Sequence, residues 1–216
     1  MSQYVLRPRA SIQMALILSG AIASFISNAH EIAAPAAVDP HAAHHHMMAN
    51  NDVKRSMASY AVPHLDLVRD DGATVSLDNE LNDGRPVVLS FIFTTCTTIC
   101  PMTSQVFSML QRKLDDDRSK VHLVSISIDP EQDTPARLRA YAARFRAGAS
   151  WQHYTGTLQA SILAQQAFDV YRGDKANHAP VTLVRAAAGS SWVRFDGFAT
   201  VDDLLVEARR GLTAAR

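Results

Sequence analysis

A nearly continuous run of branched and aromatic residues at positions 86–93 is the feature that most constrains the fold of this chain. Such a run is typical of a strand that is buried on both faces of a sheet. After a short turn, residues 101–114 place Val106, Leu110 and Leu114 at the spacing of one helix face. A buried strand that leads directly into a helix predicts an α/β domain with this strand at the centre of its sheet.

Strand-like and helix-like segments alternate through the rest of the chain. The alternating pattern and turn residues of positions 62–72 predict a hairpin near the start of the domain. Further strands are expected at residues 121–128, 181–184 and 192–195, and helices are expected to begin near Thr134, Thr157 and Thr200. This alternation predicts a central sheet with helices on both faces.

Residues 1–29 have the pattern of an export signal or a membrane anchor. Arg7 and Arg9 precede an apolar run at residues 10–26, and Ala29 is a small residue suited to cleavage. The run also approaches the roughly 20 residues that span a bilayer, so an uncleaved anchor is the alternative. No cysteine lies near the end of the run, which excludes a lipoprotein anchor. We therefore expect a bacterial periplasmic protein, soluble or tethered to the inner membrane by this segment.

Residues 30–58 predict a flexible linker rich in His and Met, which leaves residues 59–216 as one globular domain. The linker has no sustained helical or strand period. Imidazole and thioether groups suit copper, so the segment is either a solvated linker or a secondary place of metal capture. The residues that would capture metal are His41, His44, His45, His46, Met47 and Met48.

Charge and cysteine content exclude two classes of protein. The chain has 21 Lys+Arg and 21 Asp+Glu, so no long-range field draws it to nucleic acid, and no nucleic-acid partner is expected. Its two cysteines lie four positions apart and are too few for a disulfide scaffold that staples distant segments. Their proximity instead indicates a metal-binding or redox-active pair.

Cys96 and Cys100 lie between the central strand and the helix that follows it, which is the usual position for sites in open α/β sheets. Pro101 suits the first helical position, so we expect both thiols on the turn just before the helix. There the helix dipole and free N–H groups should lower the pKa of both thiols. Two sulfurs at this spacing suit copper or zinc, and the same spacing permits a disulfide.

His178 is the best candidate for a third ligand. It precedes the strand expected at residues 181–184, and in a sheet of this topology that loop runs beside the cysteine turn. An imidazole there would complete a site for Cu(I) and, with one more ligand, Cu(II). His64, His122 and His153 lie on or beside predicted strands and are expected to be ordinary surface or core residues.

Several of these segments together are similar to one known family. They are the hairpin region 65–72, the cysteine segment 91–102, the segment 127–135 with the sequence Ser-Ile-Asp-Pro-Glu-Gln-Asp-Thr-Pro, and His178. In combination they resemble the Sco/SenC/PrrC family of copper-binding assembly factors for respiratory oxidases, over nearly the whole domain.

The resemblance implies a fold, a metal and a partner. The fold would be thioredoxin-like, with a central mixed sheet flanked by helices and an N-terminal hairpin. One copper would be held by Cys96, Cys100 and His178. The protein would deliver this copper to the binuclear copper centre of an oxidase subunit, or reduce the thiols of that centre. Other envelope copper carriers or thiol reductants would be further partners.

Two departures from the family pattern keep an alternative function open. Asn177 stands where members often have an acidic residue, and Pro180 is closer to redox thioredoxins, in which a cis-proline abuts the cysteine pair. The alternative is an envelope thiol–disulfide oxidoreductase in which one of Cys96 and Cys100 attacks a substrate disulfide and the other resolves it. A peroxidase of related fold ranks last, because no arginine lies near Cys96 in the sequence.

Asp129 and Asp133 follow the second buried strand, at the same edge of the sheet as the cysteine turn. One hypothesis is that they support the metal site or dock a partner. The simpler interpretation is that Asp129 and Pro130 form a turn while Asp133 contributes to helix capping.

Overall fold

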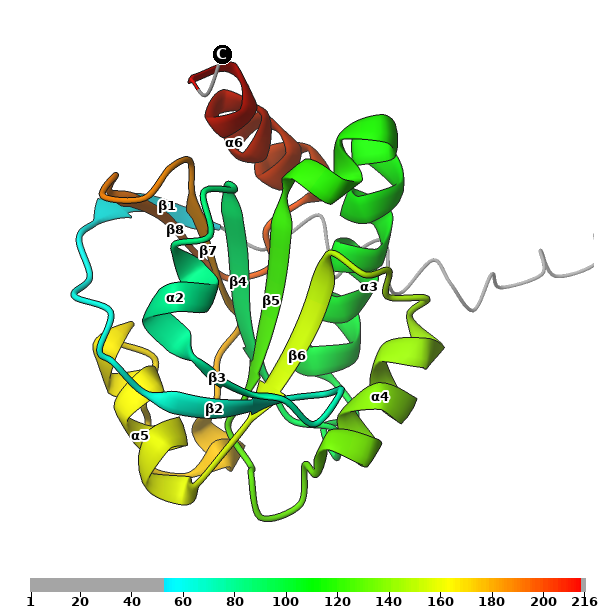
Figure 1. Ribbon diagram of the computed structural model, residues 1–216, viewed down its shortest axis with the longest axis vertical. Coiled ribbons are helices and arrows are strands. Elements are labelled where there is room, and N and C mark those ends of the chain that lie inside the picture. The colour runs from blue at the N-terminus through cyan, green and yellow to red at the C-terminus, as the bar shows by residue number, and fades with distance from the viewer. Residues whose placement is uncertain (1–52, 215–216) are drawn as a thin grey trace, which may run out of the picture. The chain divides into compact units, whose positions relative to one another are not determined.

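The computed structural model describes residues 53–214, whose strands form an eight-stranded mixed sheet in the order β1-β8-β7-β4-β5-β6-β2-β3 (Figure 1). β4, β5 and β6 are parallel to one another, and β7 is antiparallel to β4. The strands are β1 (Lys54–Ala58), β2 (Asp66–Arg69), β3 (Thr74–Ser76), β4 (Val87–Ile92), β5 (His122–Ser127), β6 (Trp151–Thr155), β7 (Val181–Arg185) and β8 (Trp192–Asp196).

Helices cover both faces of this sheet, α2 and α5 on one side and α3, α4 and α6 on the other (Figure 1). The helices are α2 (Leu77–Leu81), α3 (Ile99–Leu114), α4 (Pro135–Arg144), α5 (Leu158–Ala167) and α6 (Val201–Ala214), with short 3₁₀ turns η1 (Asp115–Lys120) and η2 (Lys175–Asn177). The mixed sheet between two helical layers confirms the architecture predicted from the alternating segments.

β4 is the central strand because its two faces pack against different helices. All six of its residues are buried. Leu89 and Phe91 belong to the core cluster that contains the buried residues of α2 and α5, whereas Val88 belongs to the cluster with α3 and α6. Side chains of a strand alternate between faces, so burial of both faces requires the continuous apolar run seen in the sequence.

The predicted hairpin is confirmed, with β2 pairing antiparallel to β3 and Leu67 opposite Val75. Its turn contains Gly72 at φ 93°, a left-handed conformation that glycine adopts without steric cost. Helix starts are confirmed as well. Thr134 Oγ1 accepts a hydrogen bond from the N–H of Arg137, and Thr157 Oγ1 accepts one from the N–H of Ala160.

The boundary between linker and domain lies earlier than expected. The sequence pattern predicts a linker through residue 58, but residues 54–58 form β1, which pairs with all five residues of β8. β1 is an edge strand with mostly exposed side chains, so it lacks the apolar pattern by which buried strands are recognised.

Other predictions fall on segments that are not described. The signal or anchor at residues 1–29 and the metal-capture residues 41–48 lie outside residues 53–214. Within residues 53–214, no helix has the length and apolar character needed to cross a membrane.

Candidate metal and redox site

The two cysteines lie at the junction between β4 and α3, as predicted, but in different local structures. Cys96 lies on the turn after β4, where its N–H donates to the carbonyl of Phe93 at 3.2 Å. Helix α3 begins at Ile99, so Cys100 lies in the first helical turn and not before it. Both thiols are free, and Cys96 Sγ accepts a hydrogen bond from the N–H of Cys100 at 3.4 Å. The turn therefore brings the two residues together.

The two thiols ionise very differently. Partial burial disfavours the Cys96 thiolate, but hydrogen bonds from the N–H groups of Cys100 and Thr98 outweigh burial and lower the pKa of Cys96. Cys100 is only 1% exposed, and burial raises its pKa well above the usual range for a thiol. The expectation of two thiols with lowered pKa is thus right in direction for Cys96 and wrong for Cys100.

Burial of Cys100 comes from a small apolar cluster. Cys100 packs with Ile92 at the end of β4 and with Leu138 and Tyr141 of α4. Tyr141 is buried, its hydroxyl lies 2.8 Å from Ser104 Oγ, and burial raises its pKa. Tyr141 could not be recognised from the sequence as a neighbour of the site, because it lies on α4, whose docking position the sequence does not reveal.

Asp133 holds the cysteine turn through hydrogen bonds to its backbone and side chains. Its fully buried carboxylate accepts hydrogen bonds from the N–H and the hydroxyl of Thr94 and from Ser127 Oγ. The capping role expected for Asp133 is wrong, since Thr134 is the residue that caps α4. Asp133 instead fixes the backbone two residues before Cys96.

His178 lies in the predicted place, in the loop between η2 and β7, and is 7% exposed. Its Nε2 lies 3.0 Å from the carbonyl oxygen of Phe91, and its ring meets the ring of Phe93 edge-on with centroids 6.3 Å apart. Burial lowers the pKa of His178, so the imidazole is neutral near neutral pH. Because a carbonyl can only accept, Nε2 carries the proton and Nδ1 carries the lone pair.

An ion pair ties the histidine loop to the loop after β5. Lys175 Nζ, three residues before His178, lies 2.5 Å from Asp129 Oδ2, and this interaction raises the pKa of Lys175. Asp129 is buried, and its carbonyl accepts the N–H groups of Gln132 and Asp133. The predicted turn at Asp129 is confirmed, while Lys175 was missed because a surface lysine in a loop carries no signal.

The three proposed ligands are only partly assembled. Among residues 53–214, no three His, Cys, Asp or Glu side chains lie close enough to hold a metal ion together. Cys96 and Cys100 are adjacent, whereas Nε2 of His178 is engaged by the carbonyl of Phe91. The other histidines lie as expected, His122 and His153 buried in the sheet and His64 exposed beside Asp78.

Comparison with known proteins identifies related chains. The family model described as SCO1/SenC matches residues 53–188. The SCO1 protein homolog of Bacillus subtilis (strain 168) is 35% identical over 105 residues, which are 48% of this chain and 53% of that protein. The chain spans about half the length of the curated relatives that it matches.

Two solved structures extend the comparison to the fold. BsSco, described as a member of the Sco family of cytochrome c oxidase assembly proteins in which a disulfide switch was identified, is 27% identical with a TM-score of 0.61, covering 73% of this chain and 96% of BsSco. Arabidopsis thaliana ScoI with copper bound is 25% identical with a TM-score of 0.59, covering 71% and 99% of the two chains. These similarities confirm the thioredoxin-like fold.

Proposed function

Because the chain belongs to the SCO1/SenC family, we propose that it is a copper-binding assembly factor for a respiratory oxidase. It holds one copper through Cys96, Cys100 and His178 and delivers the metal to the binuclear copper centre of an oxidase subunit. The family relation supports this function, since BsSco is described as a cytochrome c oxidase assembly protein and the Arabidopsis thaliana relative was solved with copper bound.

The observation that carries the proposal is a shared anchor at the end of β4. The N–H of Phe93 donates to Cys100 Sγ at 3.4 Å, and the carbonyl of Phe91 lies 3.0 Å from His178 Nε2. Two residues 78 positions apart in the chain thus contact the same three-residue segment, which supports their convergence on one ion. The ring of Phe93 lies edge-on to that of His178, and Phe93 packs against the apolar cluster that contains Cys100.

Copper capture requires a small change at His178. The neutral ring already has the protonation state of a ligand, and its Nδ1 has no hydrogen-bond partner among the described residues. Rotation of the ring, or a shift of the loop after η2, would turn a nitrogen toward the sulfurs. The lost bond to Phe91 would be replaced by a metal–nitrogen bond.

The donor set suits copper better than a hard cation. Thiolate and imidazole ligands are soft or borderline and select Cu(I), Cu(II) or zinc over magnesium and calcium. Thiolates are available only when Cys96 and Cys100 are reduced, because a disulfide offers no thiolate ligand. Copper loading is therefore coupled to the redox state of the pair, and oxidation should abolish it until a reductant is added.

Metal analysis of the purified full chain tests the proposal. The reduced wild type should bind one tight copper, Cys96→Ala and Cys100→Ala should bind none, and His178→Ala should bind more weakly. His64→Ala removes an exposed histidine from the same domain and should leave binding unchanged. Deleting residues 30–52 should also leave the tight site intact. Equal binding by wild type and His178→Ala would remove that residue from the ligand set.

A second candidate function is thiol–disulfide exchange, which the asymmetry of the two thiols favours. Cys96 is partly exposed with a lowered pKa, as an attacking thiol requires, and Cys100 is buried with a raised pKa, as suits a resolving thiol. Measured alkylation by iodoacetamide should be faster at Cys96 than at Cys100. If His178→Ala lost copper and kept disulfide exchange, the metal site and the redox pair would be separable.

The place of action that we propose is the bacterial envelope, with residues 1–29 acting as a cleaved signal or a membrane tether. Copper delivery to an oxidase and a thiol pair that cycles with oxidation both suit a compartment outside the cytosol. Fractionation of cells that express the full chain tests this. Recovery in the cytosol would contradict it.

A further inference from the structure

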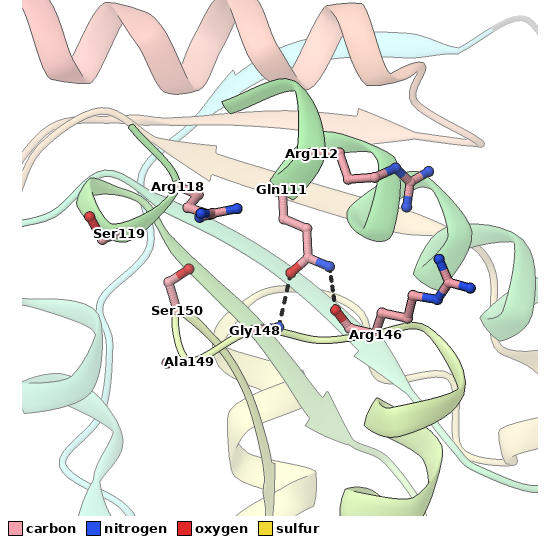
Figure 2. Close-up of a pocket in the computed structure, with 8 residues that line it drawn as sticks. All are labelled: Gln111, Arg112, Arg118, Ser119, Arg146, Gly148, Ala149 and Ser150. Carbon is pink, nitrogen blue, oxygen red and sulfur yellow. Dashed lines mark hydrogen bonds between the residues drawn. The ribbon is translucent and has the colours of Figure 1, made fainter. Parts of the chain in front are cut away.

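Three arginines gather around one surface hollow that the metal proposal leaves unused. Arg112 of α3, Arg118 of η1 and Arg146 after α4 line a hollow with a volume of about 370 Å³, together with Gln111, Gly148 and Ser150 (Figure 2). The arginines come from three separate segments of the chain. Arg112 follows Cys100 by 12 positions on α3, which places the hollow about 18 Å along the helix from the cysteine.

The positive charges of this hollow are not balanced by the protein. Arg112 donates a hydrogen bond to the neutral Ser108 Oγ, and the ion pairs found among residues 53–214 do not include Arg112, Arg118 or Arg146. η1 does contain three aspartates, but none of them lines the hollow, and Asp117 pairs with Lys120. Like charges that share one concave surface repel each other, and the fold does not neutralise them. An anionic ligand would therefore reduce the electrostatic repulsion among the three arginines.

The loop that carries Arg146 is joined to α3 by two hydrogen bonds. Gln111 Nε2 donates to the carbonyl of Arg146 at 2.6 Å, and Gln111 Oε1 accepts the N–H of Gly148 at 3.0 Å (Figure 2). Arg146 has φ 56°, a left-handed conformation just after the end of α4. Glycine usually occupies this position, because a side chain there is disfavoured. Local stability would favour glycine at position 146, so the arginine there is not explained by the backbone conformation.

Helix geometry accounts for one of the three arginines. Arg112 lies in the last turn of α3, where the helix dipole favours a cation. Arg118 and Arg146 lie outside α3, and their side chains make no hydrogen bond or ion pair with other described residues. Their presence around the hollow therefore needs another explanation.

A second hollow adjoins the first and is lined mainly by apolar residues. Val106, Met109 and Phe198 line it between α3 and the loop that leads to α6, with a volume of about 560 Å³, and Arg112 lines both hollows. Asp202 also lines the second hollow, where its carboxylate pairs with Lys113. In Figure 2 the guanidinium groups of Arg112 and Arg146 lie on one side of Gln111, while Arg118 lies on the other. The charges are thus spread along the surface and do not focus on one point.

We propose that the two hollows form a docking surface for an acidic segment of a partner protein. Acidic side chains of that segment pair with Arg112, Arg118 and Arg146, and an apolar side chain beside them occupies the second hollow. The spread of the charges and the adjoining concave apolar surface favour an extended peptide over a single inorganic anion or a flat lipid surface. The inference goes beyond the copper proposal and requires no metal.

Fluorescence anisotropy with a defined probe tests the surface. The probe is a labelled synthetic peptide with four consecutive glutamates followed by two phenylalanines, titrated with the full chain at low salt. Arg118→Gln and Arg146→Gly should each weaken binding by about two- to fivefold, the size expected for one exposed ion pair. Arg146→Gly should leave the melting temperature unchanged or raise it, because glycine suits the left-handed conformation. Loss of binding without loss of stability would separate recognition from folding.

Arg137→Gln is the matched control. It removes one exposed cation from the first turn of α4, at the opposite end of that helix from Arg146, and should leave binding unchanged. A peptide with lysines in place of the glutamates should not bind. Equal binding of the glutamate peptide by wild type, Arg118→Gln and Arg146→Gly would overturn the proposal. So would competition by millimolar inorganic phosphate alone, or arginine-dependent binding only to phosphatidylglycerol vesicles.

Discussion

Replacement of Asp133 by alanine is the sharpest test of how the cysteine turn is held. The carboxylate of Asp133 is fully buried and accepts hydrogen bonds from the N–H and hydroxyl of Thr94 and from the hydroxyl of Ser127. Asp133→Ala leaves these donors without an acceptor in a place that water does not fill freely. Two of them belong to Thr94, which lies two residues before Cys96, so the turn should loosen as the domain loses stability.

The size of the effect follows from the bonds that are lost. A hydrogen bond to a charged group contributes about 1.5–3 kcal/mol, and bonds to one carboxylate are not additive. We therefore expect Asp133→Ala to lower the free energy of unfolding by about 3–5 kcal/mol. For a domain of this size, about 2–4 °C of melting temperature corresponds to 1 kcal/mol, so the melting temperature should fall by about 6–20 °C.

Two assays measure the effect of Asp133→Ala. Urea denaturation gives the free energy of unfolding, and iodoacetamide alkylation under native conditions gives the accessibility of Cys96 and Cys100. Asp133→Asn keeps the shape and one acceptor oxygen and should cost clearly less than alanine. Asp202→Ala removes an exposed carboxylate that pairs with Lys113 and should change stability by less than about 1 kcal/mol. If Asp133→Ala cost no more than Asp202→Ala, the reasoning about the buried carboxylate would be refuted.

Three further predictions concern other parts of the domain. Gly211→Ala should destabilise the domain by about 1–3 kcal/mol in urea denaturation, because a Cβ there meets Pro86 Cγ at 2.5 Å, which outweighs the better helix propensity of alanine. Burial lowers the pKa of His122 below 6.5, so its neutral form stabilises the fold above pH 6.5. This contribution to stability should be lost as the pH falls through the lowered pKa. His122→Gln should therefore flatten the measured pH dependence of the free energy of unfolding. Lys175→Met breaks the ion pair with Asp129 and should speed amide hydrogen exchange in residues 175–179.

Each of these predictions has a control of matched chemistry. Thr213→Ala changes an exposed residue of the same helix as Gly211 and should be nearly neutral. His64→Gln changes an exposed histidine and should change the free energy of unfolding at pH 7 by less than about 1 kcal/mol. Lys113→Met breaks another lysine–aspartate pair and should not affect exchange in residues 175–179. Equal effects of test and control variants would contradict the corresponding argument.

The central part of the fold could be predicted because burial leaves a strong mark on sequence. β4 packs on both faces and so reads as an unbroken apolar run, and the caps of α4 and α5 use threonines that bond locally. β1 could not be predicted in the same way. It joins the sheet only through β8, with mostly exposed side chains, so its pairing depends on a partner strand more than 130 residues away.

The site could be predicted in its residues but not in its electrostatics. The position of the cysteines follows from the strand–helix junction, which is a local feature. The raised pKa of Cys100 depends on Leu138 and Tyr141, and the bond of His178 depends on the carbonyl of Phe91. These are tertiary contacts between segments about 40 to 90 residues apart, which neither spacing nor composition encodes. For the same reason no pattern indicated that three distant arginines line one hollow.

The loop after β5 contacts both the cysteine turn and the histidine loop. Asp133 holds the cysteine turn through Thr94, and Asp129, four residues earlier, holds the histidine loop through Lys175. One short acidic loop therefore positions both halves of the proposed metal site, by buried hydrogen bonds on one side and by a half-exposed ion pair on the other. Buried bonds resist opening, whereas an exposed pair exchanges readily with water. The histidine loop should consequently be the part that moves when His178 turns toward the sulfurs, while the cysteine turn stays fixed.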